Sequence, residues 1–278
     1  MKKINRRSFL AAAGLTAAAL ALTACGGSAS STASSTASSA ASSEAASTSA
    51  AVELTTVEAG KLTMATNAAF PPYEMTTDAG EFEGIDIDTA KAIAEKLGLE
   101  LQIDDMDFDA ALLSVQQGKA DIVMAGVTVT DERKAVMDFS DSYATGIQSI
   151  IVPEGSDITS PDDLAGKKIG TQRGTTGYIY CSDDFGDDAV VAYDDGLTAV
   201  QALNNGQVDA VVIDNAPAKE FVAANPGLVI LDTSYAEEDY AIGLAKGSAL
   251  EDAVNATLEE LKADGTLQSI VDKYITAE

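Results

Sequence analysis

The sequence predicts an α/β fold for the chain that follows residue 55, on two observations. Short apolar runs alternate with stretches in which apolar residues recur at helical spacing, as in successive strands and helices. Glycine, proline and helix-capping residues separate these segments and mark their ends. About 225 residues follow the N-terminal region, which is enough for one large domain or two small ones.

The first strands and helices are expected before residue 126. Helices are predicted over 88–97 and 109–117; Asp88 caps the first, and Gly98 and Gly118 end the two. The apolar runs predicted to form strands in this part are 61–66, 101–103 and 120–125.

A second set of units begins near Gln148. Pro161 suits the first position of a helix, the turn over 174–177 precedes another, and Ser248 can cap a third that Gly265 ends. Further helices are predicted over 196–203, 215–224 and 267–274, and strands over 149–152, 168–171, 189–192, 208–213 and 240–244.

Residues 1–25 have the pattern of a secretion signal. A basic start is followed by an apolar segment over 9–22, which is short for a membrane-spanning helix. The motif Leu22-Thr23-Ala24-Cys25 resembles a bacterial lipobox, so we expect Cys25 to be acylated and to anchor the protein at the extracytoplasmic face of the cell membrane. The alternative is an ordinary signal with an incidental cysteine. Arg6-Arg7 leaves open whether export follows the general or the twin-arginine route.

Residues 26–55 consist almost entirely of Ser, Ala and Thr. Such a segment cannot bury enough apolar surface to fold, so the composition predicts a disordered tether. A flexible coil of roughly 27 residues spans on the order of 30 Å. The folded part is therefore expected to move freely above the membrane.

The composition excludes several classes of function. The formal charge is −27, and it becomes −31 without the four basic residues of the signal, so nucleic acid is not an expected partner. The absence of histidine excludes His-based triads and His metal ligands, and we expect neither a metal nor a cofactor. Cys181 is the only cysteine besides Cys25, so the folded part has no disulfide. We expect Cys181 to be a packed small side chain, with a reactive thiol as the alternative.

The segment from Ala125 to Arg133 is the strongest functional signal. It places a small-residue turn, the Thr128 hydroxyl and the Arg133 guanidinium within nine positions. A guanidinium binds a carboxylate through two parallel charge-assisted hydrogen bonds, and nearby N–H groups and a hydroxyl can complete the partners of that carboxylate. The alternative from the residues alone is a solvated helix start with Asp131 near the N-cap.

This segment and the motifs around it resemble the family 3 extracellular solute-binding proteins of amino-acid ABC uptake systems. The resemblance covers residues 58–276 and includes the order of the motifs. It implies a two-lobed periplasmic-binding-protein fold with a ligand cleft between the lobes and a hinge that closes on the ligand. The chain would cross between the lobes near 142–148 and 231–240. The implied lobes are 56–145 plus 238–278 for lobe 1, and 146–237 for lobe 2.

The resemblance also implies which residues hold the ligand. Arg133 would bind the α-carboxylate of a free amino acid, with Ala125, Gly126 and Thr128 beside it. In lobe 2, Thr175 and Thr176 would lie at a helix N-terminus, where a carboxylate is favoured. Asp214 would receive the α-ammonium, although a carboxylate at a strand end can also cap the next helix.

The remaining candidates concern the side chain of the ligand. Phe70 and Phe108 match two aromatic positions that pack on it, with ordinary core packing as the alternative. Asn67 and Gln172 form an amide pair that favours a neutral polar side chain, such as that of glutamine, over a cationic one. Asp86, which would border the pocket, and Glu74 leave a cationic side chain open.

We therefore expect a monomeric binding protein, and not an enzyme, that delivers an amino acid to an ABC permease in the membrane. A dehydratase-like enzyme on the same scaffold is one alternative. It would need a positioned acid or base, and every matched polar residue is already assigned to a charge of the ligand. A sensory protein is the other alternative, and it would need a separate signalling partner.

Overall fold

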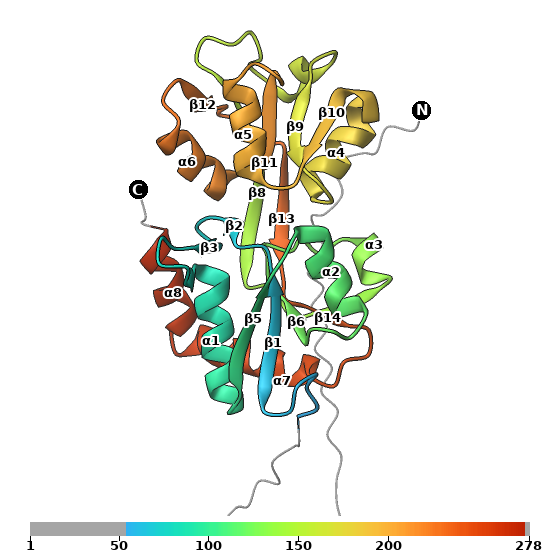
Figure 1. The fold of residues 1–278 in the computed structure, drawn as a ribbon, viewed down its shortest axis with the longest axis vertical. Helices are drawn as coiled ribbons and strands as arrows, with labels where there is room; N and C mark the ends of the chain where they lie inside the picture. Colours follow the sequence, from blue (N-terminus) through green and yellow to red (C-terminus); the bar gives the residue numbers. More distant parts are fainter. Residues whose placement is uncertain (1–53, 276–278) are drawn as a thin grey trace, which may run out of the picture. The chain divides into compact units, whose positions relative to one another are not determined.

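The computed structural model describes residues 54–275, which contain two main β-sheets flanked by helices and one small sheet (Figure 1). The predicted secretion signal, the predicted lipid site Cys25 and nearly all of the predicted tether lie outside the described residues. None of the described helices is long and apolar enough to cross a membrane.

The sheet of lobe 1 has the strand order β5-β1-β6-β14-β7. Its first strand, β1, pairs in parallel with β5 and β6, whereas β14 is antiparallel to β6 and β7. The strands are β1 (Lys61–Thr66), β5 (Glu100–Asp105), β6 (Ile122–Val123), β7 (Met137–Phe139) and β14 (Gly243–Ala245). The helices of this lobe are α1 (Ile85–Leu97), α2 (Phe108–Gln116), α3 (Asp131–Lys134), α7 (Glu251–Ala263) and α8 (Thr266–Tyr274). The small sheet joins β2 (Ala69–Phe70), β3 (Glu74–Thr76) and β4 (Phe82–Glu83).

The sheet of lobe 2 has the strand order β10-β9-β11-β8-β12, with β13 also paired to β8. The strands are β8 (Ala144–Pro153), β9 (Ile169–Gln172), β10 (Val190–Tyr193), β11 (Ala210–Asp214), β12 (Leu228–Ile230) and β13 (Ala236–Tyr240). The helices are α4 (Thr176–Phe185), α5 (Gly196–Asn204), α6 (Asn215–Ala224) and two 3₁₀ turns, η1 (Pro161–Leu164) and η2 (Asp187–Ala189).

The chain passes between the lobes along β8 and β13, which run antiparallel with Tyr240 opposite Ala144 and Ala236 opposite Gln148 (Figure 1). The predicted two-lobed α/β fold with two crossovers is therefore confirmed. The predicted lobe boundaries, after 145 and after 237, fall inside these two strands rather than in loops. The boundaries themselves remain predictions.

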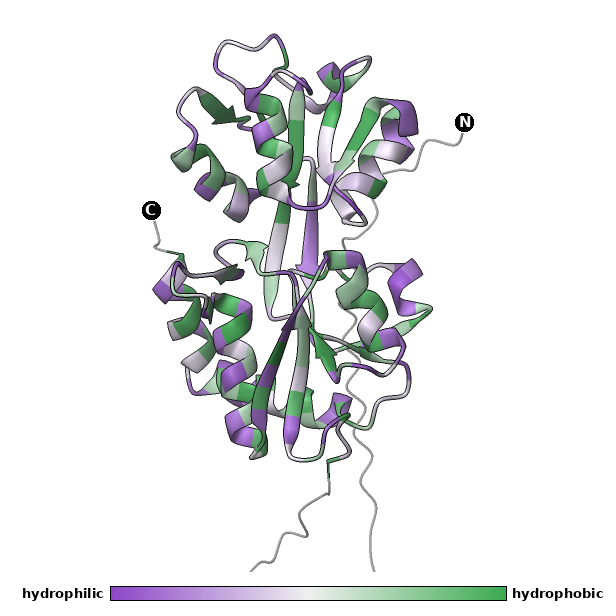
Figure 2. Ribbon diagram, in the orientation of Figure 1, coloured by the Kyte–Doolittle hydropathy of each residue, from purple (hydrophilic) through white to green (hydrophobic). Residues whose placement is uncertain are grey.

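Buried strands form the centre of each lobe. In β1 every residue from Leu62 to Thr66 is buried, and all of β11 is buried, as expected for strands covered by helices on both faces. Figure 2 shows apolar residues concentrated in these central strands and on the inner faces of the helices, with polar residues on the outer faces. Burial of this apolar surface is the main term that stabilises such a fold.

The start of α1 differs from the prediction. The helix begins at Ile85, so Asp88 lies in its first turn and is not the cap. Gly84 is the residue before the helix, with φ 132°, and a β-carbon there would lie 2.1 Å from the carbonyl oxygen of Tyr73. Asp88 instead bonds α8, accepting from Lys273 Nζ at 2.7 Å and from the Tyr274 hydroxyl at 2.8 Å.

Two predictions near the C-terminus were also wrong. The strand expected over 240–244 is divided between β13 and β14, because the chain leaves one sheet and enters the other there. Ser248 is not the N-cap of α7, which begins after Leu250.

Candidate functional site

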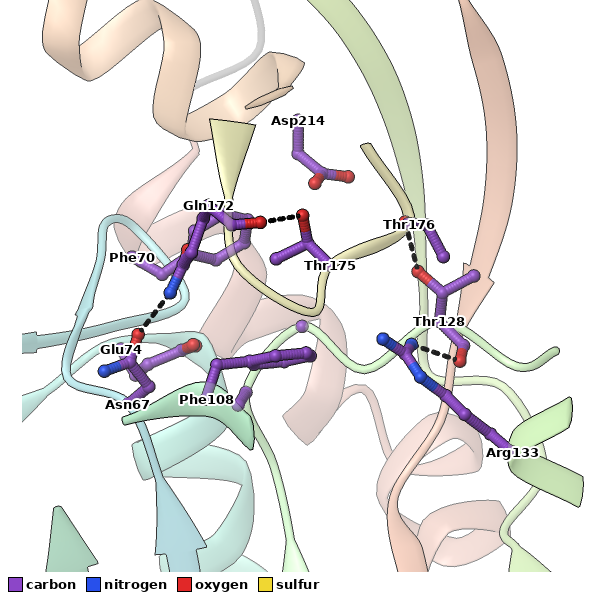
Figure 3. Close-up of a pocket in the computed structure, with 12 residues that line it drawn as sticks. Asn67, Phe70, Glu74, Phe108, Thr128, Arg133, Gln172, Thr175, Thr176 and Asp214 are labelled. Atoms are coloured by element: carbon purple, nitrogen blue, oxygen red, sulfur yellow. Dashed lines mark hydrogen bonds between the residues drawn. The ribbon is translucent and has the colours of Figure 1, made fainter. Parts of the chain in front are cut away.

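A cavity lies where the carboxyl ends of strands from both lobes meet. In lobe 1 these strands are β1 and β6, and in lobe 2 they are β9 and β11; open α/β sheets place ligand sites at this edge. The cavity is small, with about 20 Å³ open to the centres of water-sized spheres, so its lining side chains nearly fill it. Its lining residues are Asn67, Phe70, Glu74, Phe108, Ala125, Gly126, Thr128, Arg133, Gln172, Thr175, Thr176 and Asp214 (Figure 3).

The structure brings all the predicted ligand residues except Asp86 to this one cavity, and Glu74, the other acid considered for a cationic side chain, also lines it. Asp86 does not border the cavity, contrary to expectation. It lies behind the lining, fully buried, where its carboxylate accepts a bond from the Gly126 N–H at 3.0 Å and one from the Tyr143 hydroxyl at 2.7 Å. Asp86 therefore supports the turn at Gly126 instead of facing a ligand.

Arg133 enters the cavity from a short helix. Thr130 caps α3 by accepting from the Arg133 N–H at 3.2 Å, so the cap is Thr130 and not Asp131. The guanidinium donates to the carbonyl of Thr128 at 2.8 Å and, across the lobes, to that of Gly174 at 3.1 Å. It also lies 5.3 Å from the centre of the Phe108 ring, within the range of a cation–π contact. Arg133 is thus a positioned cation at the cavity wall (Figure 3).

Gly126 allows the turn before Arg133 to pass close to Phe70. Its φ is 54°, and a β-carbon at this position would lie 2.9 Å from the Phe70 ring. Residues with side chains rarely adopt this backbone region, and here there is also no space for one. The Ala125–Gly126 turn therefore requires glycine.

The lobe 2 side of the cavity contains the start of α4. Thr175 caps this helix by accepting from the Tyr178 N–H at 3.3 Å, and its own hydroxyl donates to the Gln172 carbonyl at 2.8 Å. Thr176 is the first helical residue. A helix N-terminus presents unpaired N–H groups and a partial positive charge, which favour an anion.

Asp214 ends β11 on the side of the cavity opposite Phe108 (Figure 3). Its carboxylate accepts from Gln148 Nε2 at 2.7 Å and from the Tyr240 hydroxyl, and it makes no hydrogen bond that caps α6. Burial raises the pKa of Asp214 to about 7; the charge of Glu238 adds to this, whereas the bonds from Tyr240 and Gln148 oppose it. A cation beside Asp214 would favour its charged form.

The two side-chain amides predicted to face the ligand, Asn67 and Gln172, are hydrogen-bonded to each other. Gln172 Nε2 donates to Asn67 Oδ1 at 2.8 Å, which links the two lobes, and Asn67 Nδ2 donates to the carbonyl of Met106 at 3.0 Å. Glu74, in contrast, is 1% exposed, and its Oε2 has no hydrogen-bond partner among the described residues. Burial, together with the nearby charge of Asp86, raises the pKa of Glu74 well above its usual value.

Sequence reasoning missed three residues on the crossover strands. Gln148 of β8 and Tyr240 of β13 bond Asp214, and Glu238 of β13 accepts from Gln148, Thr128 and Thr176. No local motif marks them. The only available signal is the two-residue alternation of a strand, which places Glu238 on the same side as the aromatic Tyr240.

The comparisons with known proteins agree with this geometry. Residues 62–277 match the sequence model of the bacterial extracellular solute-binding proteins, family 3. A probable histidine-binding protein of Neisseria gonorrhoeae is 32% identical, over 99% of this chain and 98% of the relative. Among solved structures, the arginine-, lysine-, histidine-binding protein ArtJ from Geobacillus stearothermophilus is 34% identical, with a TM-score of 0.75 over 78% of this chain and 96% of that chain. An ancestral arginine-binding protein bound to arginine is 43% identical, with a TM-score of 0.74 over 78% and 98%.

Proposed function

The chain belongs to the bacterial extracellular solute-binding proteins, family 3, and from this premise we propose that it captures a free amino acid and delivers it to an ABC import permease. Like its relatives, it is a solute-binding protein and not an enzyme. The cavity supports this role by holding binding groups from both lobes.

The observation that carries the proposal is the placement of opposite charges in one cavity. Arg133 and the N-terminus of α4 would hold the α-carboxylate, and Asp214 would hold the α-ammonium. Each charge of a zwitterion would then have a partner, as burial requires. The groups come from both lobes, so ligand binds the closed arrangement better than an open one, and this difference drives closure.

The expected preference for a neutral side chain over a cationic one is contradicted by the arginine-binding relatives. The contacts of the cavity give a physical reason, because Asn67 and Gln172 bond each other, whereas a carboxylate oxygen of Glu74 is left without a partner. We infer that Glu74 receives a cationic side chain, for which a guanidinium offers several donors in a fixed plane.

A thermal-denaturation screen over the free amino acids tests the proposal. An amino acid present at 100 times its Kd should add about 2.7 kcal/mol to the free energy of unfolding. Arginine and lysine should stabilise the protein, and Glu74→Gln should lower the affinity for both more than the affinity for glutamine. The proposal fails if no amino acid changes the unfolding temperature.

We also propose that Cys25 anchors the protein to the membrane, on the evidence of its lipobox alone. Cys25→Ala should release the protein from the membrane fraction and abolish labelling with a fatty-acid probe. The lipobox interpretation is wrong if the variant still carries the label.

A further inference from the structure

Glu238 is a buried carboxylate on a strand that joins the two lobes. In β13 the residues alternate, so Glu238 and Tyr240 are buried while Glu237 and Asp239 are exposed. Glu238 is 6% exposed and faces the same region as Tyr240, whose hydroxyl bonds Asp214. A crossover strand thus presents two polar side chains toward the binding cavity.

One carboxylate oxygen of Glu238 accepts hydrogen bonds from three different parts of the molecule. Its Oε2 accepts from Thr176 Oγ1 at 2.9 Å, from Gln148 Nε2 at 3.0 Å and from Thr128 Oγ1 at 3.2 Å. Thr128 belongs to lobe 1, Thr176 begins α4 in lobe 2, and Gln148 lies on the other crossover strand. We call these four residues the Glu238 junction.

Backbone contacts attach Thr128 to β13, the strand that carries Glu238. Thr128 forms a β-bridge with Tyr240, and the next residue, Val129, donates to the carbonyl of Asp239. Thr128 is thereby attached to β13. The bond from Thr176, at the start of α4, joins this unit to the rest of lobe 2. It is one of the contacts that opening of the lobes would break, together with the bonds from Arg133 to Gly174 and from Gln172 to Asn67.

Two of the three donors in the junction, Thr128 and Thr176, lie beside Arg133 and at the N-terminus of α4, the groups that the proposed function assigns to the ligand carboxylate. Thr128, Thr176 and Arg133 all line the cavity. Burial lowers the pKa of the Arg133 guanidinium, and the charge of Glu238 is the largest of those that oppose this effect. A hydroxyl has one proton to donate, so a hydroxyl bonded to Glu238 cannot donate to another carboxylate at the same time.

We propose that Glu238 is a positioning residue that acts as an internal substitute for the ligand carboxylate. Its carboxylate accepts from Thr128 of lobe 1 and from Thr176 of lobe 2, so it holds the two lobes together and the protein can close before an amino acid binds. An incoming carboxylate then replaces Glu238 as the acceptor of the threonine hydroxyls. Only this last step rests on the proposed function; closure without amino acid does not.

The test measures the distance between the lobes by electron paramagnetic resonance with two spin labels. Labels are placed at two exposed positions with Lys119→Cys in lobe 1 and Asp183→Cys in lobe 2, in a chain that also has Cys25→Ser and Cys181→Ala. Without amino acid, the otherwise unaltered chain should show a closed and an open distance. Loss of a hydrogen bond to a charged group changes an equilibrium constant by about tenfold. Glu238→Gln and Thr176→Val should therefore each lower the ratio of closed to open molecules about tenfold.

Glu237→Gln is the matched control, because it removes a neighbouring charge from the exposed face of the same strand and should leave the ratio unchanged. The proposal is overturned if the unaltered chain shows only the open distance, or if Thr176→Val keeps the original ratio. Thr176→Val decides the matter even if Glu238→Gln does not fold. Saturating arginine should close all these proteins; failure to do so would count against the proposed ligand and leave the result without amino acid intact.

Discussion

Arg133 and Asp214 define the chemistry of the cavity because their charges are opposite and both are buried. Arg133 is held by Thr130, Thr128 and Gly174, and Asp214 by Gln148 and Tyr240. Side chains fixed in this way lose little further freedom when a ligand arrives. The identity of both residues follows from motif positions. Arg133 is held in part by its own segment, whereas the partners of Asp214 come from the two crossover strands.

Arg133→Ala should weaken binding of the amino acid by about 2–5 kcal/mol, because the buried α-carboxylate of the ligand would lose its charged partner. Arg133→Lys keeps the charge but loses the planar pair of donors, so its affinity for amino acid should lie between those of the unaltered protein and Arg133→Ala. Isothermal calorimetry measures both, with the exposed Lys134→Ala on the same helix as the control. Unchanged affinity in Arg133→Ala would contradict the carboxylate assignment.

Asp214→Asn should weaken binding by about 1–3 kcal/mol, the range for loss of a charged hydrogen-bond partner. The loss should disappear for a ligand whose α-amino group is acetylated, because that group carries no charge. Calorimetry with both ligands checks this, and the exposed Asp232→Asn serves as the control. Equal losses for the two ligands would place the ammonium elsewhere.

At the scale of elements, the site depends on tight turns at the ends of strands and on two crossover strands. The order and approximate extent of most elements could be predicted, because helical and strand periodicity are local properties. The prediction failed at the start of α1, where the close approach of Gly84 to Tyr73 sets the boundary, and at 240–244, where the chain changes sheets.

Gly126→Ala should destabilise the protein by about 1–3 kcal/mol, since it adds both backbone strain and a contact with Phe70. Gly118→Ala is a matched control, because Gly118 has a similar φ of 64° and no atom within 4 Å of the new β-carbon. Chemical denaturation should show a larger loss at position 126. Equal losses would mean that only backbone strain matters.

At the scale of the whole molecule, the buried acids make stability depend on pH. The pKa of Asp214 rises from 3.8 to about 7 on folding, mainly because of burial, and that of Asp86 rises to about 6 for the same reason. A raised pKa in the folded state means that the folded protein keeps a proton that the unfolded chain has released. Between the ordinary pKa of 3.8 and the raised value of about 7, the free energy of unfolding should therefore be greatest at the low-pH end and should fall as the pH rises.

The expected slope is at most about 1.4 kcal/mol per pH unit for each such group. Urea denaturation without amino acid, repeated between pH 4.5 and about 8, measures it. Asp214→Asn should flatten the curve near neutrality, because the amide does not titrate. A stability that rises between pH 5 and 7 would contradict the assignment of a raised pKa to Asp214.

Local sequence patterns were enough to predict the α/β class, the order of most elements and the residues at the strand ends, and the motifs indicated the family. These features are recorded locally, as periodicity, turn residues and short motifs. Contacts between distant segments were needed to show that Asp86 supports Gly126 and that Gln172 bonds Asn67 at a separation of 105 positions. The same holds for Glu238, which faces inward beside Tyr240. These roles depend on which distant segments the two sheets and their crossover strands bring together. A local sequence pattern does not specify which distant residue a side chain will contact.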